Sequence, residues 1–334
     1  MAAYTTIDNP ELFFQCKLYT GTGSEIAATL DGDENMQPDL VWIKARTDTE
    51  SHKIYDSVRG ATKHIESDTT DAEATEAQGL KSFDSDGFTI GTYSSINASS
   101  SHTYVAWCWK ESATAGFDIV AYTGSGSAHT ISHSLSAVPS VVILKGRSFG
   151  DGWGQYHKTS GNPAILAFDG DVADRYSSKW GPFFNSTAPT SSVFSVGTDT
   201  AINTSSKTHI AYLFAQKQGF SKFGSYKGNG NADGPFVYTG FRPAMVIIRN
   251  SSATGNWEIF DTKRSTYNLM HATLYADTNS AEYTGTGNQI DVLSNGFKVR
   301  NEDTNTNDNG ETTVFMAFAE APFVNSNGVP ATAR

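Results

Sequence analysis

Tyr122-Thr-Gly-Ser-Gly126 decides how this chain is built, because the run occurs three times at nearly equal intervals. An earlier copy reads Tyr19-Thr-Gly-Thr-Gly23 and a later copy reads Tyr226-Lys-Gly-Asn-Gly230, each about a hundred residues away. Similar segments at a fixed interval are typical of a chain made of repeated structural units. With 334 residues, the chain has room for three such units.

Three further landmarks follow each copy of this run in the same order. The first reads Pro38-Asp-Leu-Val-Trp-Ile-Lys44, Pro139-Ser-Val-Val-Ile-Leu-Lys145 and Pro243-Ala-Met-Val-Ile-Ile-Arg249. The second reads His52-Lys-Ile-Tyr-Asp56, Trp153-Gly-Gln-Tyr-His157 and Trp257-Glu-Ile-Phe-Asp261. The third reads Tyr104-Val-Ala-Trp-Cys-Trp109, His209-Ile-Ala-Tyr-Leu-Phe214 and Thr313-Val-Phe-Met-Ala-Phe318. These residues serve packing and turns, so the repeat predicts architecture and spells out no reaction.

The repeat divides the chain into five parts. We expect an N-terminal arm, three units and a C-terminal tail, over residues 1–13, 14–111, 117–217, 220–322 and 323–334. Chains longer than about 250–300 residues usually divide into domains. The connections between the units are short, which favours units packed side by side. The arm is either a docking segment or a strand that covers a sheet edge.

Each unit is predicted to be an antiparallel β-sandwich of about seven strands. In the second unit the strands are expected over residues 118–122, 130–135, 141–145, 153–157, 165–168, 193–196 and 209–214. Long connections between some strands favour jelly-roll-like crossings. The predicted fold class is therefore all-β, with three tandem sandwich repeats of about 100 residues.

One short helix is expected in a loop of the first unit. Thr70-Asp-Ala-Glu73 fits a capping box, good helix formers follow, and Gly79 stands at the end. The prediction is a helix over residues 71–78. Asn279-Ser-Ala-Glu282 is a weaker echo of it in the third unit.

Composition and charge exclude several classes of partner. The net charge is −11 and no cluster of Lys and Arg is present, which argues against nucleic acid. No nonpolar run approaches the ~20 residues that span a bilayer, and the N-terminus lacks a secretory pattern. Cys16 and Cys108 are too few for a disulfide scaffold and are expected to be small buried residues. We expect a soluble protein that folds in a reducing cytosol.

The glycine-rich runs are predicted to be hairpin turns. A phosphate-binding loop needs a following helix N-terminus or a Lys-Ser/Thr pair, and here a second strand follows. Glycine supplies the positive φ angles that tight turns require.

The acidic turns and scattered histidines form no metal or catalytic pattern. Asp31-Gly-Asp33-Glu-Asn35 and Asp303-Thr-Asn305-Thr-Asn307 begin like calcium loops, but they lack the later glycine and glutamate ligands. Asp169-Gly-Asp171 is a third acidic turn. We interpret all three as solvated turns, with a weakly held calcium ion as the alternative. His129 and His133 would lie roughly 13 Å apart on a strand, which is too far to share a metal ion. Since the sequence shows no known catalytic motif either, we expect no metal, no cofactor and no catalytic residues.

The tryptophans supply the candidate ligand or interface residues. Trp42, Trp107 and Trp109 lie in nonpolar runs and are expected in the core. Trp153 and Trp257 stand at equivalent positions of two repeats, which favours a shared structural role over a ligand site. Trp180, in Lys179-Trp-Gly-Pro-Phe-Phe184, has no counterpart and is the better candidate.

Several segments resemble a family of uncharacterised virion proteins from marine tailed bacteriophages, including cyanophages. They are Gln37-Pro-Asp-Leu-Val-Trp-Ile-Lys44, Asp56-Ser-Val-Arg-Gly-Ala-Thr-Lys63, Tyr104-Val-Ala-Trp-Cys-Trp-Lys-Glu111, Gly219-Phe-Ser-Lys-Phe-Gly-Ser-Tyr226, Phe236-Val-Tyr-Thr-Gly-Phe-Arg-Pro243 and Met316-Ala-Phe-Ala-Glu-Ala-Pro-Phe323. The likeness runs from Tyr4 to the C-terminus, and the second unit departs most. The family, usually labelled tail or tail-fibre-like, implies a structural or host-contacting role and supplies no catalytic residues.

Three functions remain open from the sequence. The leading hypothesis is a non-enzymatic virion protein, either a tail or fibre component or a capsid decoration, assembled in the host cytoplasm. Its partners would be other phage structural proteins, a host surface glycan and further copies of itself, with a trimer as the first expectation. The second hypothesis is a carbohydrate-binding receptor-recognition protein that uses Trp180 and the loop from Gly150 to Trp153. A polysaccharide depolymerase is the third.

Overall fold

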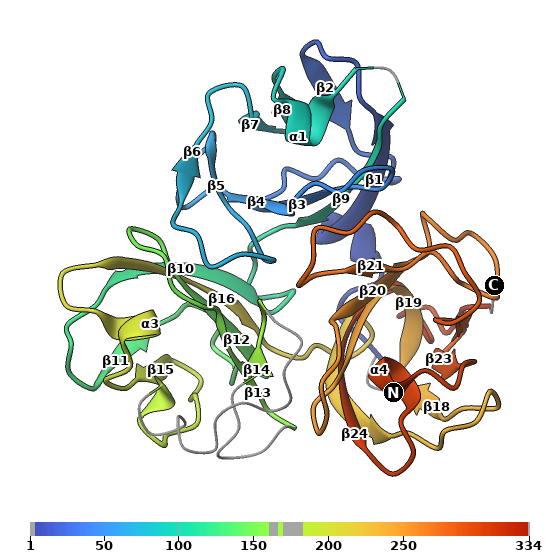
Figure 1. Ribbon diagram of the computed structural model, residues 1–334. Helices are drawn as coiled ribbons and strands as arrows, with labels where there is room; N and C mark the ends of the chain where they lie inside the picture. Colours follow the sequence, from blue (N-terminus) through green and yellow to red (C-terminus); the bar gives the residue numbers. More distant parts are fainter. Residues whose placement is uncertain (1–3, 100, 160–165, 170–182, 333–334) are drawn as a thin grey trace.

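Strands dominate the structure, a computed structural model that describes residues 4–99, 101–159, 166–169 and 183–332. Strands make up 42% of the described residues and helices 6%, which confirms the all-β class. Six antiparallel sheets pair into three sandwich-like units that surround a common centre (Figure 1). We refer to residues 14–111, 117–217 and 220–322 as units 1, 2 and 3.

Unit 1 consists of one large and one small sheet. Its elements are β1 (Phe14–Thr20), β2 (Ile26–Thr29), β3 (Leu40–Ala45), β4 (Lys53–Asp56), β5 (Lys63–Ile65), β6 (Ala74–Thr75), β7 (Leu80–Asp84), β8 (Gly87–Ile90), α1 (Ser94–Asn97) and β9 (Thr103–Trp109). The large sheet has the order β1-β9-β3-β4-β5-β6, and the small sheet has the order β2-β8-β7.

Units 2 and 3 repeat this topology. Unit 2 contains β10 (Phe117–Thr123), β11 (His129–Ser132), β12 (Val141–Gly146), β13 (Gly154–His157), β14 (Leu166–Ala167), β15 (Val193–Val196), α3 (Thr200–Asn203) and β16 (Thr208–Phe214). Its sheets are β10-β16-β12-β13-β14 and β11-β15. The strands expected in this unit are confirmed within the described residues, although β11 ends at Ser132, three residues earlier than predicted. The strand expected over residues 165–168 begins outside the described residues and is limited to Leu166–Ala167.

Unit 3 contains β17 (Ser221–Lys227), β18 (Phe236–Tyr238), β19 (Phe241–Asn250), β20 (Glu258–Asp261), β21 (Leu274–Tyr275), β22 (Ile290–Leu293), β23 (Gly296–Val299), α4 (Thr304–Asn307) and β24 (Thr312–Pro322). Its sheets are β17-β24-β19-β20-β21 and β18-β23-β22. In every unit the last strand pairs with the first and third strands, so the two ends of the repeat meet inside one sheet.

The repeated Tyr-x-Gly-x-Gly run closes each sandwich against a short helix. In unit 2 the hydroxyl of Tyr122 donates to the carbonyl of Ile202 in α3 (2.7 Å). A Cβ on Gly124 would lie 2.3 Å from the carbonyl oxygen of Thr204, so only glycine fits there. Gly126 has a φ of +75°, as expected for a turn glycine. Units 1 and 3 repeat these three features at Tyr19, Gly21, Gly23, Tyr226, Gly228 and Gly230.

A buried asparagine at the end of each short helix holds the same turn. Asn203 accepts from the amide of Ser125 (2.8 Å) and donates to the carbonyls of Ser127 (2.8 Å) and Gly197 (2.5 Å). Asn97 and Asn307 make the equivalent bonds in units 1 and 3. The helices thus serve as anchors for the turn rather than as independent elements.

The helix predicted over residues 71–78 is wrong. Ala74 and Thr75 form β6, which pairs with β5, and the amide of Glu73 donates to the carbonyl of Arg147 in unit 2 (2.8 Å). A helix of about two turns has little stability of its own, so these long-range contacts decide the conformation. The echo at Glu282 is not helical either, and its amide donates to the carbonyl of Arg46 (2.8 Å).

The core of the molecule is shared by all three units. One cluster of buried nonpolar residues draws on each large sheet, and separate clusters fill the sandwiches of units 1 and 2. Cys16 and Cys108 are buried free thiols, as predicted. The N-terminal arm crosses to unit 3, where Tyr4 donates to the carbonyl of Gly240 (2.8 Å). The described part of the arm holds a short 3-10 helix, Pro10–Leu12, and not the edge strand offered as one alternative.

Candidate functional site

The contacts between units form the most elaborate arrangement of side chains in the described structure. Each unit donates one hydrogen bond to a neighbour from the same position of the repeat. His52 donates from Nε2 to the carbonyl of Tyr275 (2.8 Å). Trp153 donates from Nε1 to the carbonyl of Glu66 (3.0 Å), and Trp257 donates from Nε1 to the carbonyl of Ala167 (2.8 Å). The bonds run from unit 1 to unit 3, from unit 2 to unit 1 and from unit 3 to unit 2. They therefore close a ring with approximate threefold symmetry.

The tautomer of His52 follows from its two partners. Trp42 donates its indole N–H to Nδ1 of His52 (2.7 Å), so Nδ1 is the acceptor and Nε2 carries the hydrogen that Tyr275 receives. Burial pushes the pKa of His52 well below its usual value, which keeps the ring neutral. A neutral imidazole thus donates the inter-unit hydrogen bond that an indole donates in the other two units.

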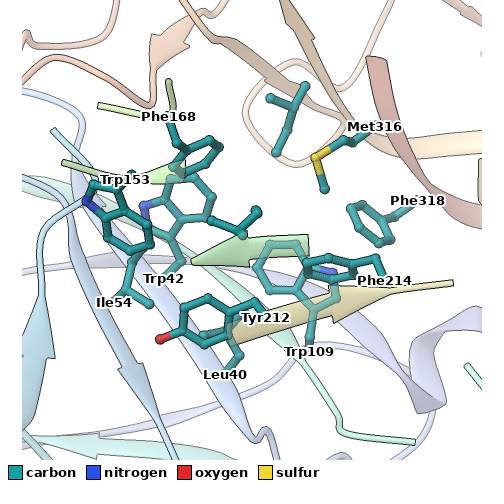
Figure 2. A pocket seen from close by; sticks show the side chains of 12 residues that line it. Leu40, Trp42, Ile54, Trp109, Trp153, Phe168, Tyr212, Phe214, Met316 and Phe318 are labelled. Carbon is teal, nitrogen blue, oxygen red and sulfur yellow. The ribbon is translucent and has the colours of Figure 1, made fainter. Parts of the chain in front are cut away.

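Aromatic side chains meet where the three large sheets converge. Trp109, Phe214 and Phe318 stand at equivalent positions of the last strands, and their ring centroids lie 5.4–6.4 Å apart. Phe168 contacts one tryptophan from each unit, at 5.4–5.8 Å from Trp42, Trp153 and Trp257. Figure 2 shows Trp109, Phe214 and Phe318 on one side of a small cavity and Phe168 on the other side. The cavity measures about 30 Å³ and its lining is entirely nonpolar, so it offers no polar ligand a partner.

An ion-pair network crosses the boundary between units 1 and 2. Within unit 1, Nε of Arg59 lies 2.5 Å from Oδ2 of Asp56, and both side chains are fully buried. Arg147 of unit 2 donates to both carboxylate oxygens of Glu73 (2.8 and 3.1 Å). The hydroxyl of Tyr212, also in unit 2, donates to Asp56 (2.7 Å). Every buried charge in this network therefore has a partner.

The same network crosses the boundary between units 3 and 1. Arg264 pairs with Asp261 (2.5 Å) and Glu282 (3.1 Å), and Arg46 of unit 1 pairs with Glu282 (2.8 and 3.0 Å). Trp107 of unit 1 donates to Asp261 (3.0 Å), just as Tyr212 donates to Asp56 at the boundary between units 1 and 2. Glu73 and Glu282, the two residues expected to lie in helices, are the matching acids of the two networks.

A second set of buried cations lies at the end of each repeated Pro-led strand. Lys145 donates to the carbonyls of Asp151 (2.8 Å) and of Thr70 in unit 1 (3.1 Å). Arg249 donates to the carbonyl of Ala167 in unit 2 (2.6 Å), and Lys44 donates to that of Ala45 (2.8 Å). Burial lowers the pKa of Lys44 and of Lys145 to about 8. The sequence contains a signal for these cations, because a basic residue ends three otherwise nonpolar runs. The repeat pattern alone did not indicate that these residues are buried and bind backbone carbonyls.

The candidate tryptophans lie away from the solvent or outside the described residues. Trp153 and Trp257 are 3% and 0% exposed and contact the neighbouring unit of the same chain. They make equivalent contacts, in keeping with their equivalent positions in the repeat. Trp180 lies outside the described residues, so the structure does not position the candidate site around it.

Two of the three acidic turns have internal partners, and most of the third, Asp169-Gly-Asp171, lies outside the described residues. Asp303 accepts from the amide of Asn305 (2.7 Å) as the N-cap of α4, and Asp31 pairs with Lys17 (2.5 Å). Within the described residues, no three His, Cys, Asp or Glu side chains gather closely enough to hold a metal ion. None of the described helices has the length and nonpolar character that a membrane span requires.

Sequence reasoning missed a group of exposed aromatic residues in unit 3. Phe236 and Tyr238 on β18 are 47% and 51% exposed, and Tyr267 in the loop after β20 is 79% exposed. The signal for the first two is the run Phe236-Val-Tyr238, in which aromatic residues alternate with one buried valine.

Comparison with curated proteins finds no match. Comparison with family models finds one, which covers residues 9–322 and therefore all three units and both inter-unit networks. The chain belongs to the family described as a domain of unknown function, DUF7483.

Proposed function

We propose that this chain is a non-enzymatic structural protein of a tailed-bacteriophage virion, as a tail or fibre component or a capsid decoration. The observation that carries the proposal is the closed ring of three units with one shared core. A ring of this kind buries the inner face of every unit and ties each unit to both neighbours. It supplies a rigid body with three sandwiches and their loops directed outward, which suits a part of a particle that must persist outside the host.

The sequence resemblance to virion proteins of marine tailed phages supports the same function. The proposed location is the virion, after assembly in the host cytoplasm, and the proposed partners are other structural proteins of the particle. Assembly of the chain into a homotrimer stays part of the proposal. The approximate threefold arrangement lies within one chain, however, so burial of the central core does not require other copies.

Immunogold labelling of purified particles with antibodies against this chain tests the proposal. We expect label at one fixed location on the tail or the capsid of most particles. Label absent from purified particles, with the chain abundant in the soluble fraction of infected cells, would contradict a structural role. Release of reducing ends from host polysaccharide by the purified chain would contradict the non-enzymatic assignment.

A second candidate function is recognition of a host glycan. The exposed aromatic residues of unit 3 favour it, because aromatic rings with one solvent-facing side are the groups that stack on sugar rings.

A further inference from the structure

The outer face of the small sheet in unit 3 carries two exposed aromatic residues on one strand. Phe236 and Tyr238 point outward from β18, while Val237 between them is only 6% exposed and packs inward. The Tyr238 hydroxyl lies 3.3 Å from that of Tyr4 in the N-terminal arm. Two large rings thus stand about half exposed next to each other on one side of a strand.

The equivalent strands of the other units show that the fold does not require these rings. In unit 1 the outward positions of β2 are Ala27 and Thr29, and Thr29 pairs with Gly87 just as Tyr238 pairs with Gly296. In unit 2 the exposed positions of β11 are Thr130 and Ser132. Small residues suffice for the sandwich in two of three units, so the aromatic pair in unit 3 serves another purpose.

Charged side chains continue the face beside the rings. Lys298 stands opposite Phe236 on β23, and its Nζ lies 2.9 Å from Oδ1 of Asp233. Arg300 reaches the same Asp233 oxygen (3.3 Å), and its Nε lies 2.8 Å from Oδ2 of Asp291 on β22. The two cations and two anions balance, so this part of the face presents many hydrogen-bonding groups and little net charge.

An open groove of about 480 Å³ adjoins the charged group. Arg300 forms part of its wall, together with the side chains of Gln289, Asn301 and Glu302. Its volume falls within the range of about 300–1,000 Å³ that small-ligand sites occupy. Ion pairs join the wall of the groove to the position of Phe236, because Arg300 and Lys298, which stands opposite Phe236, both bind the carboxylate of Asp233.

We propose that this face of unit 3 is a binding site for a neutral saccharide, with Phe236 and Tyr238 as the stacking surface and the groove at Arg300 as the polar end. A sugar ring presents C–H groups on one side and hydroxyls around its edge. The C–H groups can stack on the aromatic rings, and the hydroxyls can form hydrogen bonds with the paired carboxylate, guanidinium and amide groups. An anionic glycan fits less well, because Glu302 and Asp303 line the groove and the chain carries a net charge of −11. This inference rests on the second candidate function and not on the location of the chain in a virion.

The test is a glycan array that carries neutral oligosaccharides and their sialylated, uronic-acid and sulfated counterparts, probed with the full chain. We expect binding to neutral glycans and titration of the best one in solution. The double variant Phe236→Ala/Tyr238→Thr gives unit 3 the outward residues of unit 1, and we expect it to weaken binding at least about tenfold. Arg300→Gln should weaken binding to the same glycan while it leaves the fold unchanged.

Tyr267→Ala is the matched control, because it removes an aromatic ring of unit 3 that is 79% exposed, lies in the loop after β20 and does not line the groove. It should bind as the wild type does. Absence of binding to every glycan, or binding restricted to the acidic glycans, would overturn the saccharide assignment. Equal affinity of the wild type and the double variant would overturn the site. None of these results would change where immunogold labelling locates the chain.

Discussion

The boundary between units 3 and 1 and the boundary between units 2 and 3 occupy equivalent places in the ring but differ in chemistry. At the first, Trp107 donates to a buried Asp261 that is paired with Arg264. At the second, His157 stands at the position of Asp261 and Met316 at that of Trp107. His157 donates through Nε2 to the carbonyl of Phe315 (3.2 Å), and Thr159 binds its other nitrogen. An uncharged ring and a backbone carbonyl thus replace a buried ion pair.

The difference shows which interactions the ring depends on. The aromatic contacts at the centre and the hydrogen bonds from His52, Trp153 and Trp257 occur at all three boundaries. Among the described residues, the ion-pair network of two arginines, one aspartate and one glutamate occurs at two of them. We infer that nonpolar packing closes the ring, and that the buried charges mainly fix which surfaces pair, since they cost desolvation that their attraction barely offsets.

Removal of a central ring should therefore have the largest effect. Phe318→Ala deletes a side chain that is 1% exposed and contacts both Trp109 and Phe214. We expect the free energy of unfolding in urea to fall by about 4 kcal/mol, because the cavity left by a phenylalanine cannot close fully. Tyr267→Ala, on the surface of the same unit, should change it by less than about 0.5 kcal/mol. A loss below about 1 kcal/mol for Phe318→Ala would show that other contacts close the ring.

Neutralisation of the ion pair should distinguish the two boundaries. Asp261→Asn leaves the fully buried Arg264 without its nearest anion, and we expect a loss of about 3 kcal/mol in urea unfolding. The matched change His157→Asn removes one hydrogen bond of a neutral ring, and we expect about 1 kcal/mol. Equal losses would mean that the two boundaries do not differ in the way described.

Acidification should act in part through the boundary that lacks the ion pair. Burial lowers the pKa of His157 to about 4, whereas a histidine in the unfolded chain titrates near 6.5. The unfolded chain binds the proton first as the pH falls. The contribution of His157 to stability is therefore fully present above pH 6.5 and is lost as the pH falls toward 4. The loss from this group is at most roughly 3 kcal/mol.

His157→Gln should reduce this pH dependence, as measured by urea unfolding at pH 7.5 and pH 4.5. Some dependence will remain in the variant, because burial also lowers the pKa of His64 and of His209 to about 4 and pushes that of His52 well below its usual value. Identical losses on acidification in wild type and variant would exclude His157 as a contributor.

Loss of a turn anchor should have a smaller and local effect. Asn203→Ala removes three hydrogen bonds that hold the turn after β10, and we expect a loss of about 2 kcal/mol. Asn97→Ala should cost a similar amount, because the same bonds occur in unit 1. A difference of more than about 1 kcal/mol between the two would show that the units are not equivalent in this respect.

The sequence was sufficient for the strands and for the repeat, because both depend on local patterns. Nonpolar runs such as Val141–Gly146 need no distant partner to be identified as buried strands. The helix over residues 71–78 failed for the opposite reason. Glu73 is held by Arg147 of another unit, and a capping-box pattern contains no information about such a contact.

The inter-unit contacts could be predicted only in part. Equivalent positions for Trp153 and Trp257 indicated a common role, but the direction of their bonds depends on how three units close around a centre. His52 in place of a tryptophan conceals the third member of the set, since an imidazole and an indole share only an N–H donor. The aromatic pair on β18 was visible as Phe236-Val-Tyr238, and its significance appears only when units 1 and 2 supply the comparison.

Scanning calorimetry of the whole chain tests most directly whether the three units form one closed body. We predict a single endothermic transition whose calorimetric and van't Hoff enthalpies agree, which Phe318→Ala shifts to lower temperature without splitting it. Separate transitions for the units, or a Phe318→Ala variant in which one part melts early while the rest is unaffected, would contradict it.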